Sequence, residues 1–330
     1  MTTFPGWIVR KGDGANTAAL EELDSSLLDD LDTTVRVWYS SINYKDALAL
    51  HGRPGVIRRT PLIPGIDLTG EVLETSNEKW KPGDVVTLNG AGLGEELNGG
   101  LAALARVDGD NLTAVPASFS PAQAAAIGTA GFTAALAQLA LERHGLTPDQ
   151  GPVLVTGAGG GSGSIAVSLL SHSGYQVVAA TGRPERLSER LRALGADEVI
   201  NRHELEDQTR PLGRQRWAGV VDSAGGAVLA GALATLRSGG AAAAFGNAGG
   251  AQLSTTVLPF ILRGVALIGI DSVRTGPALR QQAWDLLAHD LDPTHLDAVI
   301  RTVPLAEARN AAAALLEGHG TGRTIVEIAR

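Results

Sequence analysis

Short apolar runs separated by turn residues fill the first third of the chain. Apolar and polar residues alternate along residues 34–39, and a turn at residues 81–84 leads into the apolar run at 85–88. Alternation with a period of two, bounded by turn residues, is typical of strands with one buried face. The pattern predicts a compact, mostly β region with strands at residues 34–39, 67–73, 85–88, 101–107 and 112–115.

The pattern changes at Ser120 and Pro121. Ser120 can cap a helix that has Pro121 at its first position, and an alanine-rich segment follows. Beyond it, apolar strands alternate with glycine turns and helices, which predicts a parallel sheet covered on both faces. The predicted strands are 153–156, 176–180, 198–200, 219–222, 241–245 and 266–270. Helices near 281–290 and 305–317 and a strand at 323–328 close the chain.

The composition excludes several classes of protein. A length of 330 residues predicts about two domains, and fractions of 44% hydrophobic and 19% charged residues exclude a disordered chain. Because 27 basic residues face 35 acidic ones, the net charge of −8 argues against binding to nucleic acid or to an anionic membrane. Cysteine is absent, which excludes disulfides, thiolate catalysis and cysteine-ligated zinc. We expect neither a membrane span nor a secretory signal, and hence a cytoplasmic protein.

A glycine-rich turn at residues 157–163 carries the strongest chemical signal. Gly157, Gly160 and Gly163 follow a buried strand and open an apolar helix, which is the setting of the dinucleotide-binding fingerprint. In such a turn, glycines let the backbone approach a pyrophosphate, and the helix N-terminus holds its charge. Gly161 and Ser164 lie in the same turn. A glycine-rich loop without a ligand is the alternative.

The end of the next strand indicates which nucleotide is bound. An NAD site places an acidic residue there for the ribose hydroxyls. This chain instead has Thr181, Gly182 and Arg183, with Arg202 after the third strand. Because guanidinium groups pair well with a dianionic phosphate, the sequence predicts NADPH. In the alternative, Arg183 and Arg186 only occupy the start of a helix.

Several recognisable motifs lie along nearly the whole chain. They are residues 43–46, 64–70, 128–134, 194–197, 217–222, 258–263, 269–272 and 322–326. Together they resemble the medium-chain dehydrogenase/reductase superfamily. Within it, the chain is most similar to the zinc-independent bacterial acrylyl-CoA reductase group, whose members are often labelled quinone oxidoreductases.

The resemblance implies an α/β protein with two domains. A GroES-like, β-rich catalytic domain is expected from residues 1–123 and 272–330, and a Rossmann domain with a doubly wound parallel sheet from 124–271. The relatives pair through the sheet edge near residues 266–270, so a homodimer is expected. Asp67 stands where zinc alcohol dehydrogenases have Gly-His-Glu, which together with the lack of cysteine predicts a reaction without metal.

NADPH can pass hydride to a carbon β to a carbonyl without a metal, if the protein holds the acceptor and supplies a proton. From the resemblance, the catalytic candidates are Tyr44, Asn43, Asp46 and Asp67. Tyr44 is the preferred proton donor, because a phenol is neutral near pH 7 and still carries an acidic proton, although it could equally be a packing residue. Asn43 could orient substrate or cap a turn, and Asp46 and Asp67 could be structural. Coenzyme contacts are also expected from Thr129, Thr133, Asn247 and Arg323.

Two further features bear on the substrate. Arg53, Arg58 and Arg59 form a basic cluster that would suit the phosphates of a CoA thioester, or could be a solvated loop. The loop at residues 89–100 departs from the acrylyl-CoA reductase pattern at Ala91, Leu97 and Asn98. The predicted activity is therefore NADPH-dependent reduction of an enone or enoyl thioester. The alternatives are quinone reduction and a non-catalytic NADPH-binding protein.

Overall fold

The computed structural model describes residues 2–208, 210–318 and 320–328. The chain forms two compact units, one from Met1–Phe132, Ser272–Ala288 and Leu296–Arg330, and a second from Thr133–Asp271 and His289–His295. The boundary between the units at Phe132 and Thr133 thus falls within the helix Pro121–Arg143. The domain bounds expected from the sequence stay a prediction. Each unit is described by itself.

The first unit is built on a seven-stranded sheet. The order is β14 (Ile300–Pro304), β15 (Arg323–Glu327), β3 (Thr33–Ser41), β4 (Asp67–Thr75), β5 (Val85–Asn89) and β7 (Thr113–Ala114), with β6 (Leu104–Val107) paired to β3. A separate hairpin joins β1 (Thr3–Lys11) to β2 (Asn16–Asp24). Apolar residues on alternate positions of β3, β4 and β5 form a common core, as the period-two pattern predicts. The unit also holds α1 (Tyr44–Leu50) and α10 (Ala308–Leu316), which pack against each other.

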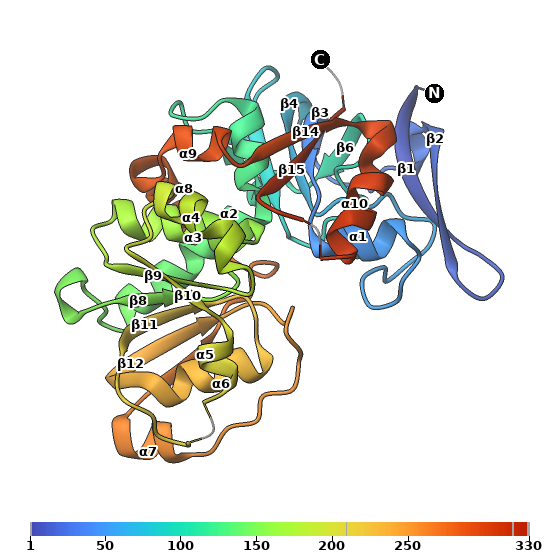
Figure 1. Cartoon of the computed structure of the whole chain (residues 1–330). Helices are drawn as coiled ribbons and strands as arrows, with labels where there is room; N and C mark the ends of the chain where they lie inside the picture. The colour runs from blue at the N-terminus through green and yellow to red at the C-terminus, as the bar shows by residue number, and fades with distance from the viewer. Residues whose placement is uncertain (1, 209, 319, 329–330) are drawn as a thin grey trace. The chain divides into compact units, whose positions relative to one another are not determined.

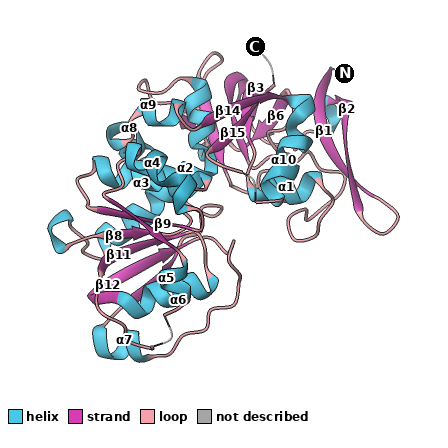
Figure 2. Ribbon diagram, viewed as in Figure 1, coloured by secondary structure: helices cyan, strands magenta, loops and turns pink. Residues whose placement is uncertain are grey.

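The second unit is a six-stranded parallel sheet. Its order is β10 (Glu198–Asn201), β9 (Val177–Thr181), β8 (Val153–Val155), β11 (Trp217–Asp222), β12 (Leu236–Ala244) and β13 (Ala266–Gly269). Figures 1 and 2 show α3 (Gly161–His172) and α4 (Pro184–Ala193) over one face, and α5 (His203–Glu206) and α6 (Gly226–Thr235) over the other. All six predicted strands are present. The strand order reverses between β8 and β11, which is where a doubly wound sheet binds its ligand.

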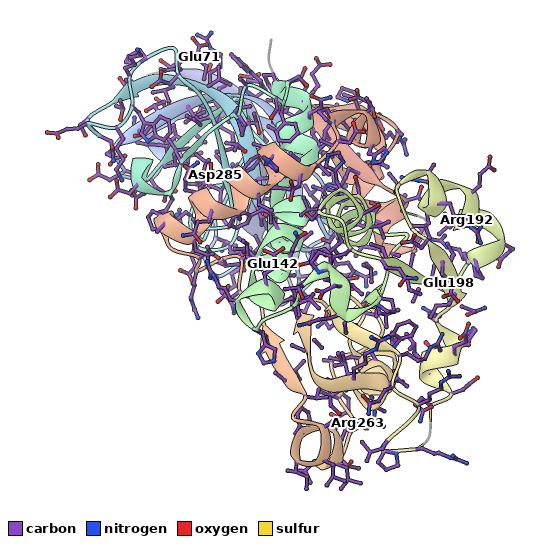
Figure 3. All side chains as sticks on the ribbon, turned by 90° about the vertical axis from the view of Figure 1, so that its left-hand side faces the viewer. Glu71, Glu142, Arg192, Glu198, Arg263 and Asp285 are labelled. Atoms are coloured by element: carbon purple, nitrogen blue, oxygen red, sulfur yellow. The ribbon has the colours of Figure 1, made fainter. Side chains whose placement is uncertain are left out.

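Helix α7 (Leu258–Arg263) precedes the edge strand β13. Arg263, labelled in Figure 3, donates hydrogen bonds to the carbonyls of Ala234 and Leu236 and so ties α7 to the start of β12. Helices α8 (Pro277–Asp290) and α9 (Pro293–Asp297) each include residues of both units.

Helix α2 (Pro121–Arg143) begins as predicted. The Ser120 side chain accepts a hydrogen bond from the Gln123 amide at 3.2 Å, which is a capping interaction. By length and composition alone, α2 is long and apolar enough to cross a membrane. However, 83% of its most apolar window is buried inside the structure, as in the core helix of a folded domain.

Three strands were not predicted from the sequence. They are β1, β2 and β14. The predicted strand at 101–107 begins only at Leu104, and that at 112–115 is reduced to Thr113 and Ala114. In β2 only Leu23 is buried, and the strand pairs only with β1, so its buried face is too small to impose a clear apolar alternation.

Candidate functional site

The glycine turn lies at the end of β8, beside the switch point of the parallel sheet. Gly157 has φ of +59°, a conformation that favours glycine. A Cβ on Gly163 would lie 2.3 Å from the carbonyl oxygen of Gly157, so no side chain fits between the turn and the first turn of α3. These are the constraints that a dinucleotide cradle places on its glycines.

The N-terminus of α3 points its amides at this turn. The Ser164 amide makes the first bond of the helix, to the carbonyl of Gly160, so the amides of Gly161, Ser162 and Gly163 have no acceptor within the helix. The Ser164 hydroxyl donates to the Gly161 carbonyl at 3.0 Å. No charged residue lies between positions 157 and 164. The turn can therefore receive a phosphate anion on its backbone.

Two arginines flank the end of β9. Thr181 is buried, and its hydroxyl accepts a hydrogen bond from the Arg183 amide at 3.3 Å. Arg202 packs over Gly182, where an added Cβ would lie 3.0 Å from its Nε, and it pairs with Glu206 at 3.4 Å. The structure thus brings Thr181, Gly182, Arg183 and Arg202 together around one strand end. This arrangement suits a phosphate on the ribose better than a ribose hydroxyl.

Asp67, at the start of β4, lies at the centre of a buried polar cluster in the first unit. It accepts five hydrogen bonds: from the Ser41 hydroxyl (2.5 Å), Asn43 Nδ2 (2.7 Å), Asn89 Nδ2 (2.9 Å), and both the amide (2.8 Å) and hydroxyl (2.7 Å) of Thr129. Its side chain is fully enclosed. With five donors directed at its two oxygens, Asp67 holds this site together.

Gly128 allows α2 to reach this cluster. The residue has φ of +46°, and an added Cβ would lie 2.6 Å from Asp67 Oδ2 and 2.9 Å from Arg323 Nη2. The helix breaks here, so that the Thr129 amide turns toward Asp67. Thr133, one turn further along α2, is buried.

Asn43 connects two carboxylates. Its Nδ2 donates to Asp67 and, at 3.0 Å, to Asp46, while its backbone amide donates to Asp46 at 2.8 Å. The Asp46 carboxylate thereby caps α1, and it also accepts from the Ile66 amide at 2.9 Å. Burial and then the neighbouring Asp67 raise the pKa of Asp46 to about 7. The structural alternatives for Asn43 and Asp46 thus have direct geometric support.

Arg323, from β15, is enclosed in the same cluster. Its Nε donates to the Ala126 carbonyl (2.7 Å), its Nη1 to Asn43 Oδ1 (3.1 Å) and its Nη2 to the Ser41 hydroxyl (2.7 Å). The side chain is 4% exposed and lies 3.8 Å from Asp67. This leaves little surface for the coenzyme contact expected from the sequence.

Tyr44 stands apart from this cluster. It opens α1 and is 58% exposed, whereas its neighbours Asn43 and Asp46 are held by hydrogen bonds. Next to it, Lys45 forms an ion pair with Glu95 at 2.6 Å. Tyr44 is therefore the member of the motif whose hydroxyl is accessible to a substrate.

The three arginines of the predicted basic cluster differ in their contacts. Arg59 forms an ion pair with Asp29, and its Nε donates to the Glu96 carbonyl at 2.6 Å. Arg59 thus connects its own loop to Asp29 and to the loop at residues 89–100. Arg53 and Arg58 are exposed, and they remain available for an anion.

The loop at residues 89–100 is a folded structure of its own. Asn98, one of its departures from the acrylyl-CoA reductase pattern, is 3% exposed. Its Oδ1 accepts from the Ile63 amide, its amide donates to Asp29, and its Nδ2 donates to the Leu27 carbonyl. Asn98 therefore anchors the loop, whereas Ala91 and Leu97 are half-buried.

Three members of the Asp67 cluster were not predicted from the sequence. Ser41 and Asn89 end strands next to β4, and pairing of Asp67 with Asn89 follows from the β4–β5 register. Arg280, from α8, is fully buried: it donates to the Asn89 carbonyl at 2.8 Å and stacks on the Phe132 ring at 4.8 Å. Burial lowers its pKa to about 10. Nothing in the local sequence distinguishes Arg280 from a surface arginine.

The donor set does not fit zinc. Asp67 is surrounded by hydrogen-bond donors and two guanidinium groups, which repel a cation. Within residues 2–208, 210–318 and 320–328, no three His, Asp or Glu side chains gather into a metal-binding group. The residues around Asp67 therefore do not form a zinc site.

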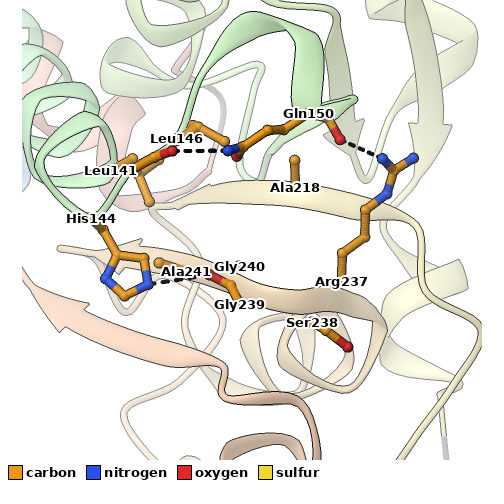
Figure 4. Close-up of a pocket in the computed structure, with 11 residues that line it drawn as sticks. Leu141, His144, Leu146, Gln150, Ala218, Arg237, Ser238, Gly239, Gly240 and Ala241 are labelled. Atoms are coloured by element: carbon orange, nitrogen blue, oxygen red, sulfur yellow. Dashed lines mark hydrogen bonds between the residues drawn. The ribbon is translucent and has the colours of Figure 1, made fainter.

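A surface cavity of about 360 Å³ lies elsewhere in the second unit, at the amino ends of β11 and β12 (Figure 4). Its polar groups are largely paired with one another: Arg237 donates to the Gln150 carbonyl, and His144 Nε2 lies 3.3 Å from the Gly239 carbonyl. The glycine turn lies at the carboxyl ends of the strands, whereas this cavity lies at their amino ends. The cavity is therefore not the coenzyme site.

The doubly wound sheet, the glycine cradle and the β-rich unit define a nucleotide-dependent dehydrogenase or reductase. Two family models match in this order: the alcohol dehydrogenase GroES-like domain over residues 29–117 and the zinc-binding dehydrogenase over residues 161–289. The chain belongs to the medium-chain dehydrogenase/reductase superfamily, in the family of acrylyl-CoA reductase AcuI and quinone oxidoreductase YhfP.

Three relatives give the extent of the similarity. The chain is 46% identical to acrylyl-CoA reductase AcuI of Ruegeria pomeroyi, over 96% of each protein. It is 44% identical to the putative quinone oxidoreductase YhfP of Bacillus subtilis, over 89% of each, and the crystal structure of YhfP with NAD gives a TM-score of 0.94 over 99% of this chain and all of that one. The YhdH oxidoreductase of Salmonella enterica with NADP is 46% identical, with a TM-score of 0.95 over 98% of this chain and all of that one.

Proposed function

We propose that this protein is an NADPH-dependent reductase that transfers hydride, without a metal, to the β-carbon of an α,β-unsaturated thioester such as acrylyl-CoA. The observation that carries the proposal is the glycine cradle at the switch point, closed to side chains by the contact between Gly163 and Gly157. The name of the relative AcuI supplies the substrate class.

In this proposal the cradle residues Gly157, Gly160, Gly161, Gly163 and Ser164 shape the turn that receives the coenzyme pyrophosphate. The amides of Gly161, Ser162 and Gly163, which have no acceptor within α3, bind its charge. Thr181, Arg183 and Arg202 hold the 2′-phosphate, and Thr129, Thr133 and Asn247 are further candidates for contact. When bound, NADPH supplies the hydride.

After hydride has been added to the β-carbon, the proposed reaction also needs a proton, which the α-carbon of the resulting enolate takes up. We assign its delivery to Tyr44, whose phenol is exposed while Asn43 and Asp46 hold the start of α1 in place. Asp67 and Arg323 act through Asn43, by fixing both ends of its amide. Arg53 and Arg58 offer positive charge for the CoA phosphates.

The experiment follows NADPH oxidation with a panel of acceptors. Rapid oxidation with acrylyl-CoA and slow oxidation with a quinone is the expected result. The opposite preference supports quinone reduction, which the name of YhfP favours. Tight NADPH binding without oxidation by any acceptor supports a non-catalytic binding protein.

We also propose that the protein is a homodimer in the cytoplasm. The strand β13 lies at an edge of the parallel sheet, and Val257, Ile261, Leu262 and Leu267 beside or on it are 64%, 68%, 63% and 39% exposed. An open edge next to apolar side chains is typical of a surface that another chain covers. Light scattering should give twice the chain mass, and Ile261→Asp should reduce it to one chain mass. A monomeric wild-type protein would contradict this proposal.

A further inference from the structure

Asp222, the last residue of β11, is a buried carboxylate that the proposed reaction does not use. Thr156 Oγ1 donates a hydrogen bond to its Oδ1 at 2.6 Å, and the Gly225 amide donates to its Oδ2 at 2.9 Å. Both Asp222 and Thr156 are 0% exposed. The pair spans the point where the strand order reverses, because Thr156 follows β8 and β11 is its neighbour in the sheet. We call it the Thr156–Asp222 clasp.

The clasp links the loops that follow three strands. Thr156 directly precedes Gly157, and its hydroxyl and carbonyl oxygens accept hydrogen bonds from the Ser223 amide (3.2 Å) and hydroxyl (3.0 Å). The loop after β12 is joined to this region through backbone bonds, from Phe245 to the Asp222 carbonyl (3.0 Å) and from Gly249 to the Ala224 carbonyl (2.7 Å). Asn247 lies in this third loop. The clasp is thus a side-chain connection directly before the cradle, since Thr156 precedes Gly157.

A carboxylate in this position is costly to bury. Among the described residues, its charge is held by the Thr156 hydroxyl and by the amides of Gly225 and Ala224, and burial raises the pKa of Asp222. Hydrogen bonds to a charged group are stronger and more directional than neutral ones. Such a group is suited to fixing a loop conformation, which a neutral side chain would hold less firmly.

We propose that Asp222 is a positioning residue for the coenzyme, which holds residues 157–160 through Thr156 in the shape that receives the pyrophosphate. This inference rests on the proposed function, because it requires NADPH as the ligand. It assigns to Asp222 no contact with substrate or coenzyme.

The test compares Thr156→Val, which removes the hydroxyl at nearly constant shape, with Thr156→Ser, which keeps it. Asp222→Asn is the third variant. Titration of NADPH into folded protein should show a Kd raised about tenfold in Thr156→Val and Asp222→Asn, as expected for the loss of one charged hydrogen bond. Thr156→Ser should restore the wild-type Kd. If Asp222→Asn fails to fold, the two Thr156 variants carry the test.

Two controls separate positioning from loss of stability. Thr235→Val removes a buried hydroxyl that accepts from Trp217 Nε1 at 3.0 Å, at the opposite end of β11, and should lower the melting temperature without changing the Kd. Among ligands, 2′-phospho-ADP-ribose contains the pyrophosphate and should lose affinity in Thr156→Val as NADPH does. Adenosine 2′,5′-bisphosphate lacks the pyrophosphate and should bind wild type and Thr156→Val equally.

The outcomes are distinct. Thr156→Val and Asp222→Asn could both fold and bind NADPH as tightly as wild type. That result would overturn the proposed role of the clasp in coenzyme binding and leave the proposed function intact. An equal loss with Thr235→Val would also overturn it, since the effect would then follow stability. A wild-type protein that binds neither NADPH nor 2′-phospho-ADP-ribose would overturn both proposals.

Discussion

Around Asp67, side chains from several elements converge on one buried carboxylate, whereas the turn after β8 offers backbone amides and no charged residue. In the first region, Asn43, Ser41 and Thr129 each donate hydrogen bonds to Asp67. The second leaves the amides at the start of α3 without an acceptor in the helix.

This difference in hydrogen bonding shows two ways in which a protein can arrange a functional site before a ligand binds. A closed polar cluster fixes the position of one exposed group beside it, here Tyr44, while its own members do not react. An open set of amides fixes a shape that is completed by an anionic ligand. Substitutions in the first region should therefore change stability or turnover, and substitutions in the second should change coenzyme affinity.

The largest effect is expected from Asp67→Asn. The change removes the negative charge beside the enclosed guanidinium of Arg323 and places an amide donor against other donors. Because a buried charge then lacks its partner, the free energy of unfolding should fall by about 3–5 kcal/mol. Denaturant titration measures it. As a control, Asp110→Asn alters an exposed carboxylate paired with Lys79 and should change stability little. A loss as small as that of the control would show that the cluster does not depend on this charge.

Gly163→Ala tests the cradle. The new Cβ would lie 2.3 Å from the Gly157 carbonyl oxygen, so the turn must move. A shift of about 1 Å should weaken NADPH binding about a hundredfold, as a fluorescence titration would show. Gly276→Ala is a matched control, since an added Cβ there meets nothing within 4 Å. Unchanged affinity in Gly163→Ala would place the pyrophosphate elsewhere.

The two regions also differ in how much the sequence could predict. The cradle is local: a strand, three glycines and a helix lie within about 20 residues, and their spacing alone identifies the turn. The Asp67 cluster is assembled from Ser41, Asn89 and Arg280 on separate elements, so only the strand register could have indicated Asn89 and nothing indicated Arg280. The same holds for the Thr156–Asp222 clasp, whose members are 66 positions apart.

Apolar patterning explains the corresponding difference in the fold. The inner strands β8, β9 and β11 were found because burial on both faces makes each of them a short apolar run. The strand β2 was missed because only Leu23 in it is buried, and β1 was missed because it carries Pro5 and Gly6, which resemble a turn.

Tyr44→Phe should separate chemistry from binding. The change removes an exposed hydroxyl outside the Asp67 cluster, so folding should be unaffected. If Tyr44 supplies the proton, turnover with acrylyl-CoA should fall about a hundredfold, while the Kd for NADPH stays constant. Tyr175→Phe removes a hydroxyl that bonds Glu142 and should lower stability but not turnover. Equal turnover in wild type and Tyr44→Phe would leave Tyr44 as a surface residue.

The smallest effect concerns the choice of coenzyme. Arg183 and Arg202 flank the end of β9, and Arg202 is already shared with Glu206, so each contributes part of the attraction for a 2′-phosphate. Arg183→Ala and Arg202→Ala should each narrow the ratio of NADPH to NADH affinity about tenfold, with most of the change in NADPH. Arg192, which is exposed on α4 and labelled in Figure 3, provides the control. If the effect is local rather than due to net charge, Arg192→Ala should leave the ratio of NADPH to NADH affinity unchanged. Parallel losses of NADH affinity would instead assign both arginines to the shape of the strand end, because NADH carries no phosphate at that position.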